Sequence, residues 1–225
     1  MNSRTDLIVG IDDVTRCPVI GSLVCVGVMV QRNELKFLKR LGVRDSKDLT
    51  HSKIMELAQV IPKFAKIEKK FITAKQISKS KKEYNLNDME CEAYCSIAKE
   101  FIKNYPIIEI QINNFDRNRD KFIWRAEKLG FDFDWKKWII EHNNENRDIA
   151  VGTASIVAKS LSIQEYARFR GLFGDFGSGN PADEKTLKFI EDCIKAKHSK
   201  RSRLNALKIV RWNWKTVKNL EESIL

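Results

Sequence analysis

Two adjacent aspartates, Asp12 and Asp13, follow an apolar run near the start of the chain. The run Leu7–Ile11 is typical of a buried strand, so the sequence predicts both carboxylates at a strand end. Neighbouring carboxylates repel each other, and a divalent cation beside them is the usual compensation. Hydrolysis of a phosphodiester by two metal ions needs several such carboxylates converging from different elements. The pair therefore points to metal-assisted chemistry on a phosphate ester.

The charge balance points to a polyanionic partner. Lys and Arg number 41 against 30 Asp and Glu, which gives a formal net charge of +11. Such an excess favours nucleic acid over a membrane surface as the partner. The segment 195–218 is rich in basic residues, has no acidic ones and contains Trp212 and Trp214. Basic side chains beside aromatic ones suit phosphate contact and stacking on bases or sugars.

Length and composition exclude several other classes of protein. The 225 residues suffice for one domain, or for one domain with a small appendage. No apolar run approaches the length of a membrane span and residues 1–6 carry no signal-peptide pattern, so the expected compartment is the cytoplasm. The five cysteines are odd in number and lack metal-site spacing, which favours free thiols over a zinc site.

Strands and helices in alternation must position the two aspartates. Strands are predicted at residues 7–11, 22–31, 70–74, 107–112 and 131–141. Helices are predicted at residues 33–41, from residue 50 onward, and at 87–104, 150–169 and 183–197. Asn87 is the expected N-cap of the 87–104 helix, and a glycine-rich loop is expected at 171–181. The sequence thus predicts an α/β core over residues 1–170 and a small, basic, helical C-terminal element over residues 171–225.

The chain resembles the ribonuclease HII family, the type 2 ribonucleases H, and its archaeal members in particular. The frame of the family's first motif is present at Gly10–Gly21, and six further motifs follow in the family's order. They lie at Leu41–Leu49, Asn85–Glu92, Glu141–His142, Thr153–Lys159, Phe176–Asp183 and Val210–Thr216. The resemblance implies a ribonuclease H-like mixed five-stranded sheet flanked by helices. It also implies a Mg- or Mn-dependent endonuclease that cuts the RNA strand of RNA–DNA hybrids.

The family's four acidic metal ligands do not all survive in this chain. By position they fall on Asp12, Asp13, Asn113 and Glu145. Asp13 replaces the usual glutamate and Glu145 the usual aspartate, whereas Asn113 replaces an aspartate by a neutral amide. The resemblance therefore leaves Asp12, Asp13 and Glu145 as the predicted metal ligands. A register slip of one residue would place Asn114 there, which is equally neutral. Asp116 is a candidate substitute ligand, although a surface or capping role is the stronger interpretation.

The positions that read the substrate in the family have changed as well. The family's Gly-Arg-Gly is Thr15-Arg16-Cys17 here, so two side chains fill space that glycine leaves open. The tyrosine that stacks at the RNA–DNA junction in the family falls on Asn180. The residues expected to contact nucleic acid are Arg16, Ser46, Lys47, Ser155, Lys159 and Arg211.

These departures favour a catalytically impaired or inactive descendant that keeps the fold to bind RNA-containing duplex, structured RNA or a nucleoprotein. An active ribonuclease HII is the first alternative. Mg or Mn is expected if the site still binds metal, and otherwise no cofactor. The second alternative is a protein-interaction subunit whose basic segment 195–218 contacts a protein or ribonucleoprotein partner. No membrane partner is expected. The chain end Leu220–Leu225 lacks the paired aromatics of the family's sliding-clamp motif, so clamp binding is not predicted.

Overall fold

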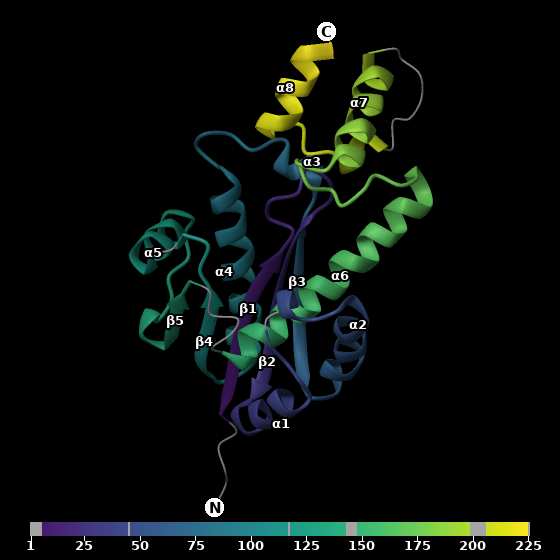
Figure 1. Ribbon diagram of the computed structural model, residues 1–225. Coiled ribbons are helices and arrows are strands. Elements are labelled where there is room, and N and C mark those ends of the chain that lie inside the picture. The colour runs from purple at the N-terminus through teal and green to yellow at the C-terminus, as the bar shows by residue number, and fades with distance from the viewer. Residues whose placement is uncertain (1–5, 45, 117, 143–147, 199–205, 225) are drawn as a thin grey trace, which may run out of the picture. The chain divides into compact units, whose positions relative to one another are not determined.

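Five strands form one mixed sheet in the computed structural model (Figure 1). The structure describes residues 6–44, 46–116, 118–142, 148–198 and 206–224. The strands are β1 (Leu7–Val14), β2 (Leu23–Gln31), β3 (Ala65–Ile72), β4 (Ile107–Asn113) and β5 (Trp138–Glu141), in the order β3-β2-β1-β4-β5. β1 pairs antiparallel with β2 and parallel with β4, and β4 pairs parallel with β5. The predicted mixed five-stranded sheet is confirmed.

The chain divides into two compact units. Unit 1 comprises residues 1–14, 24–70 and 86–161, and unit 2 comprises residues 15–23, 71–85 and 162–225. Unit 1 holds most of the sheet, and unit 2 holds the C-terminal helices. The division at residue 170 stays a prediction.

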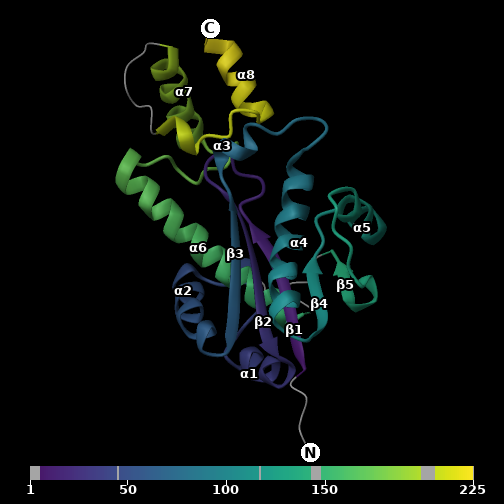
Figure 2. The same ribbon diagram turned by 180° about the vertical axis from the view of Figure 1, so that it is seen from behind.

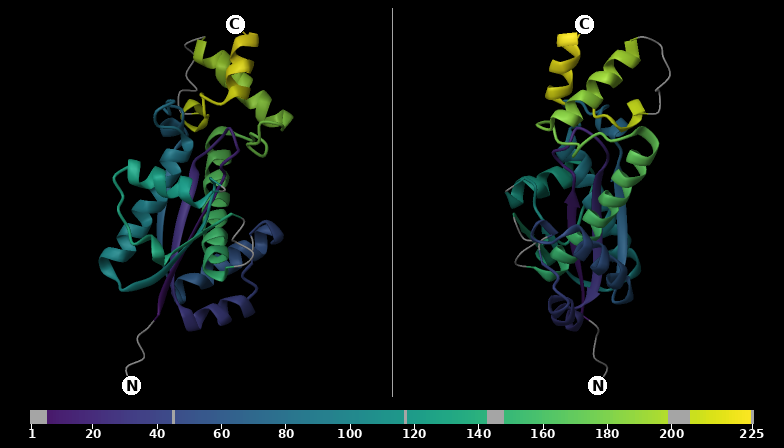
Figure 3. Two further views of the ribbon diagram at one scale, coloured as in Figure 1. Left: turned by 90° about the vertical axis from the view of Figure 1, so that its left-hand side faces the viewer. Right: turned by 45° about the vertical axis from the view of Figure 1, so that its right-hand side comes forward.

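Helices cover both faces of the sheet in unit 1. Gly27 lies against side chains of α4 (Leu86–Asn104), whereas Gly10 lies against the first turn of α6 (Ile149–Phe173). Gly27 is paired with Ile11, the neighbour of Gly10, and adjacent strand residues point to opposite faces. α4 therefore covers one face and the first half of α6 the other, as the left view of Figure 3 shows.

Unit 2 has an apolar core of its own. α7 (Glu184–His198) and α8 (Lys215–Ile224) lie next to each other in Figures 1 and 2. Phe176, Ile190 and Val217 are fully buried in this core, together with residues of the short helix η6 (Ala206–Ile209). The helical C-terminal element predicted from the sequence is confirmed. No helix in the described part of the chain is long and apolar enough to cross a membrane.

Several helices begin where local sequence signals place them. Thr50 caps α2 (His51–Val60) by accepting a hydrogen bond from the backbone N–H of Lys53. The predicted 33–41 helix is present as a short 3₁₀ turn, η1 (Arg32–Glu34), followed by α1 (Leu35–Arg40). In unit 2, α3 (Ala74–Ile77) is capped by Thr73.

Four predicted boundaries are wrong. β3 begins at Ala65, not at residue 70, because it lies at the sheet edge and its lysine-rich, exposed sequence lacks the usual apolar alternation. β5 is confined to Trp138–Glu141, since residues 131–134 are irregular and η4 (Trp135–Lys137) is a 3₁₀ turn. α6 continues to Phe173, so the glycine-rich loop starts later than predicted. Asn87 is not an N-cap, because α4 already begins at Leu86.

α5 (Arg119–Lys128) is absent from the sequence prediction. Asn118 caps it by accepting hydrogen bonds from the backbone N–H groups of Asp120 and Lys121. Its sequence is strongly charged, and its buried residues are Phe122, Arg125 and Ala126. Because one of the buried positions is an arginine, the apolar periodicity of α5 is weak, and the sequence does not predict this helix.

Gly10 provides a test of the packing between β1 and α6. A β-carbon at Gly10 would lie 2.1 Å from the carbonyl carbon of Ala150. Because that neighbour is backbone, it cannot turn aside as a side chain would. We expect Gly10→Ala to lower the free energy of unfolding by about 3 kcal/mol or more, as measured by urea denaturation.

Gly171→Ala is the matched control. Gly171 is also in α6, and no atom lies within 4 Å of the position of an added β-carbon. Alanine there is expected to raise the free energy of unfolding by up to about 1 kcal/mol. Similar effects of the two substitutions would contradict the close approach at Gly10.

Candidate active site and nucleic-acid interface

Asp12 and Asn113 lie side by side at the carboxyl ends of two parallel strands. Ile11 of β1 is opposite Ile112 of β4, which places the next residue of each strand together. Asp12 is 2% exposed, and Nδ2 of Asn113 donates a hydrogen bond to its Oδ1 over 2.9 Å. An ionised carboxylate can only accept, so Asn113 turns its NH₂ group toward Asp12 and not its oxygen. A hydrogen-bond donor thus faces the oxygen that a bridging cation would use.

Asp13 points to the opposite face of the sheet, toward α4. Its Oδ1 accepts a hydrogen bond from the hydroxyl of Tyr94 over 2.8 Å. Burial raises the pKa of Tyr94 well above its ordinary value, and the charges of Asp13 and Asp12 raise this pKa further. The phenol therefore stays protonated and donates to Asp13 at any physiological pH. Asp12 and Asp13 thus each accept a hydrogen bond from a neutral group, the amide of Asn113 and the hydroxyl of Tyr94 respectively.

The described donor set does not fit a two-metal site. Glu145, the remaining predicted ligand, lies outside the described residues. Within the part of the chain that the structure describes, no three His, Cys, Asp or Glu side chains gather closely enough to hold a metal ion. Asp12 and Asp13 face opposite sides of the sheet and Asn113 presents an NH₂ group, whereas Mg²⁺ requires converging oxygens in near-octahedral geometry. Metal binding by Asp12, Asp13 and Glu145 stays a prediction.

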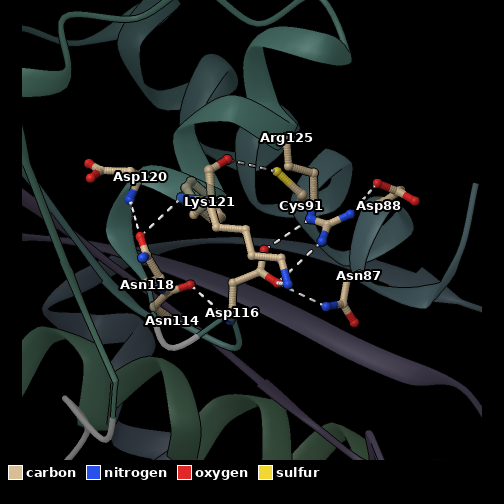
Figure 4. A network of polar contacts seen from close by, with 10 residues as sticks. Asn87, Asp88, Cys91, Asn114, Asp116, Asn118, Asp120, Lys121 and Arg125 are labelled. Carbon is tan, nitrogen blue, oxygen red and sulfur yellow. Dashed lines mark hydrogen bonds and ion pairs between the residues drawn. The ribbon is translucent and has the colours of Figure 1, made fainter.

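Asp116 is engaged in a buried ion-pair network (Figure 4). Nε of Arg125 donates to its Oδ2 and Nδ2 of Asn87 to its Oδ1, each over 2.9 Å. Nη1 of Arg125 also donates to Asp88. The side chains of Asp116 and Arg125 are 1% and 6% exposed. To act as a substitute ligand, Asp116 would have to break these bonds, so the network holds it in a structural role between α4 and α5.

The charges in this network support one another. Burial lowers the pKa of Arg125, but its hydrogen bonds to Asp116 and Asp88 outweigh burial and leave the pKa above its ordinary value. The guanidinium is therefore permanently charged, with a carboxylate on either side. These bonds anchor the loop that follows β4, and Asn113 is the last residue of β4.

Four of the predicted nucleic-acid contacts form one cluster in unit 1. The hydroxyl oxygens of Ser46 and Ser155 are 2.8 Å apart and share a buried hydrogen bond between η2 (Ser46–Asp48) and α6. Lys159 lies one turn beyond Ser155 on α6, and the exposed Lys47 follows Ser46 directly. The two lysines thus adjoin the serine pair along the chain, and phosphate binding by these four residues stays a prediction.

The other two predicted contacts, Arg16 and Arg211, belong to unit 2. Arg211 is 0% exposed, and its guanidinium donates to the carbonyl oxygens of Thr15, Arg16 and Gly21 over 2.7, 2.9 and 2.9 Å. Burial lowers the pKa of Arg211 to about 10, so the side chain is still charged at neutral pH. The geometry makes Arg211 a support of the loop that carries Arg16. Direct phosphate contact by either arginine stays a prediction.

Comparison with known proteins settles the family. A sequence model of the family described as Ribonuclease HII matches residues 9–217. The chain belongs to the ribonuclease HII family. Ribonuclease HII of Methanocaldococcus jannaschii is 34% identical to it, over 95% of this chain and 94% of the relative.

Solved structures agree with this assignment to the ribonuclease HII family. The crystal structure of ribonuclease H2 from Pyrococcus horikoshii matches with a TM-score of 0.82 and 26% identity, covering 97% of this chain and 98% of that one. A chain in the structure of the PCNA:RNase HII complex from Archaeoglobus fulgidus matches with a TM-score of 0.76 and 28% identity, covering 95% and 96%.

Sequence reasoning missed Tyr94 in this ribonuclease HII-family site. Tyr94 is one turn before Ala98 on the face of α4 that packs on the sheet, and a hydroxyl on such an apolar face is the signal that could have revealed it. Asn180 stands where the family has a tyrosine. Its Oδ1 accepts a hydrogen bond from the backbone N–H of Ala182 over 3.0 Å, so the side chain shapes a turn.

Asp116→Asn tests the buried network. The substitution keeps the shape of the side chain but removes a charge that faces buried Arg125. We expect it to lower the free energy of unfolding by about 3–5 kcal/mol in urea denaturation. Asp120→Asn is the control, because the side chain of Asp120 is 91% exposed in α5, the helix that carries Arg125. It should change the free energy of unfolding by less than about 0.5 kcal/mol. A loss for Asp116→Asn as small as that of the control would show that Asp116 is free to move.

The raised pKa of Tyr94 predicts that the folded protein loses stability at alkaline pH. Because the pKa of Tyr94 is raised above 10.0 in the folded protein, the unfolded chain loses this proton first as pH rises. The protonated Tyr94 hydroxyl therefore contributes fully to the free energy of unfolding below pH 10.0. This contribution is lost as the pH rises through the raised pKa of Tyr94. We expect the phenolate absorbance of Tyr94 to appear only with unfolding, so that Tyr94→Phe differs from the native protein only in that step. An earlier phenolate step, absent from Tyr94→Phe, would contradict the burial of this hydroxyl.

Proposed function

We propose that this ribonuclease HII-family protein binds RNA-containing duplex or structured RNA with little or no nuclease activity. The observation that carries this proposal is the hydrogen bond from the Asn113 amide to Asp12. A neutral donor stands where a two-metal mechanism needs an anionic oxygen, and the loss of one negative charge weakens the hold on two divalent cations.

The neighbours of Asn113 support the same conclusion. Asp13 is one methylene shorter than the family's glutamate and is engaged by Tyr94. Asp116 is engaged by Arg125 and Asn87, so it is no ready replacement. A misplacement of about 1 Å at a catalytic centre costs roughly a hundredfold in rate. The predicted ligands Asp12, Asp13 and Glu145 would hold Mg or Mn only weakly, because Asp12 and Asp13 face opposite sides of the sheet.

Nucleic-acid binding needs none of the missing carboxylates. The cluster of Ser46, Lys47, Ser155 and Lys159 supplies phosphate contacts, and the net charge of +11 draws a polyanion to the protein. Arg16 adds a contact from its loop. This interface is the proposed use of the fold.

An active ribonuclease HII is the second candidate, and the family match over residues 9–217 favours it. Asp12 and Asp13 are both present, and a cation could recruit Glu145. A protein or ribonucleoprotein partner at the basic segment 195–218 is a further candidate, of which residues 199–205 lie outside the described chain. The Archaeoglobus relative is described in complex with PCNA, but the end of this chain lacks paired aromatics.

Cleavage assays separate the first two candidates. The substrates are a DNA duplex with one embedded ribonucleotide and a full RNA–DNA hybrid, each with Mg²⁺ and with Mn²⁺. We expect no turnover by the native protein, and a gain of about a hundredfold or more over background in Asn113→Asp, which restores the anionic oxygen. Asn118→Asp adds the same charge on the exposed start of α5 and should stay inactive.

Binding of the same duplexes completes the test. The native protein should bind with an affinity that falls steeply as salt is raised, because phosphate neutralisation releases counterions. Clear turnover by the native chain would overturn the proposal of an impaired enzyme. The absence of both turnover and salt-dependent binding would overturn the proposed binding function.

A further inference from the structure

The loop between β1 and β2 contains a strained residue. Thr15 has φ = 64°, and among the described residues no other non-glycine residue has a positive φ. This left-handed conformation brings the side chain against the following carbonyl, and it is least tolerated by β-branched residues such as threonine. This conformation has a steric cost, so the surroundings must hold the loop in place.

Arg211 donates three of the hydrogen bonds that hold this loop, and the hydroxyl of Thr15 donates another to the carbonyl of Ser22 over 2.5 Å. The three acceptors of the guanidinium are the carbonyls of Thr15 and Arg16, at the start of the loop, and of Gly21, near its end. One planar guanidinium therefore ties both ends of the loop together. The Trp214 ring lies 5.1 Å from the guanidinium carbon and covers it.

The backbone of Arg211 is itself fixed to the loop. Its N–H donates to the carbonyl of Val19 and the N–H of Gly21 donates to the carbonyl of Ile209, each over 2.8 Å. Beside them, Glu165 accepts hydrogen bonds from the backbone N–H and the hydroxyl of Ser22 over 3.0 and 2.7 Å. The loop and the segment that carries Arg211 thus form one bonded block within unit 2.

We propose that Arg211 is a positioning residue for nucleic-acid binding: it fixes the backbone of residues 15–22, the loop that carries Arg16, and it does not touch the nucleic acid. Its complete burial keeps the guanidinium from any phosphate, and its three bonds go to the loop instead. Thr15 makes the loop dependent on this support, because the strained backbone relaxes once the bonds are lost. The inference rests on the proposed binding function and adds a residue that acts through the loop.

Arg211→Lys is the decisive variant because it keeps the charge and loses the planar, three-way donor geometry. Affinity is measured by fluorescence anisotropy with a labelled duplex carrying one embedded ribonucleotide, from about 50 to about 200 mM salt. We expect the affinity to fall by about tenfold, with an unchanged slope of log affinity against log salt.

Two outcomes would overturn the inference. Native affinity in Arg211→Lys would show that charge alone suffices. A slope of log affinity against log salt that becomes shallower by about 0.9 in Arg211→Met, but not in Arg211→Lys, would show a direct phosphate contact. Val217→Ala is the control for general destabilisation, because Val217 is fully buried in the core of unit 2. It should lower the melting temperature and leave the affinity unchanged.

Hydrogen exchange without nucleic acid separates this inference from the proposed function. The amides of residues 16–22 should exchange faster in Arg211→Lys than in the native protein, and at the native rate in Val217→Ala. Faster exchange in a protein that binds no duplex would support the positioning of the loop and refute the binding function. Unchanged exchange in Arg211→Lys would refute the positioning role, whatever the affinity.

Discussion

Two carboxylates at neighbouring positions of a strand end need compensation, and this requirement governs the site. In a two-metal nuclease the compensation is divalent charge. In this protein hydrogen-bond donors provide it on both faces of the sheet, the Asn113 amide at Asp12 and the Tyr94 hydroxyl at Asp13. Both donors are neutral, so they engage oxygens of the pair without adding charge.

Buried charges elsewhere in the protein follow the same rule but are satisfied by different partners. Arg125 lies between Asp116 and Asp88, so that opposite charges offset the cost of burial. Arg211 instead donates to three backbone carbonyls, and burial lowers the pKa of Arg211 to about 10 although the nearby Tyr166 and Glu165 oppose this shift. The first arrangement stabilises packing between two helices. The second uses a charged side chain to shape a loop, and a lysine could not replace it because the bonds need a planar fork of donors.

The sequence predicts the sheet and the location of the site, but not how the site is bonded. Strands β1, β2 and β4 are apolar runs, and the order of the family motifs is enough to place Asn113 beside Asp12. β3 is an edge strand with exposed lysines and lacks such a pattern. Tyr94 and Asp13 are 81 residues apart, and Arg211 and Thr15 are 196 apart. No local periodicity carries information about such pairs. From its motif alone Arg211 is therefore predicted to contact phosphate, although the fold buries it.

Asn113 in unit 1 and Thr15 in unit 2 differ in local strain. At Asn113 the structure is relaxed, because the amide and Asp12 satisfy each other and a repulsion between carboxylates is removed. At Thr15 the structure is strained, because a β-branched residue holds a backbone conformation that suits glycine. A loop free of constraint would relax into another shape, but this one is closed by three bonds from a buried arginine. Strain of this kind persists only where the surrounding structure holds the backbone in place, as the three hydrogen bonds from Arg211 do for residues 15–22.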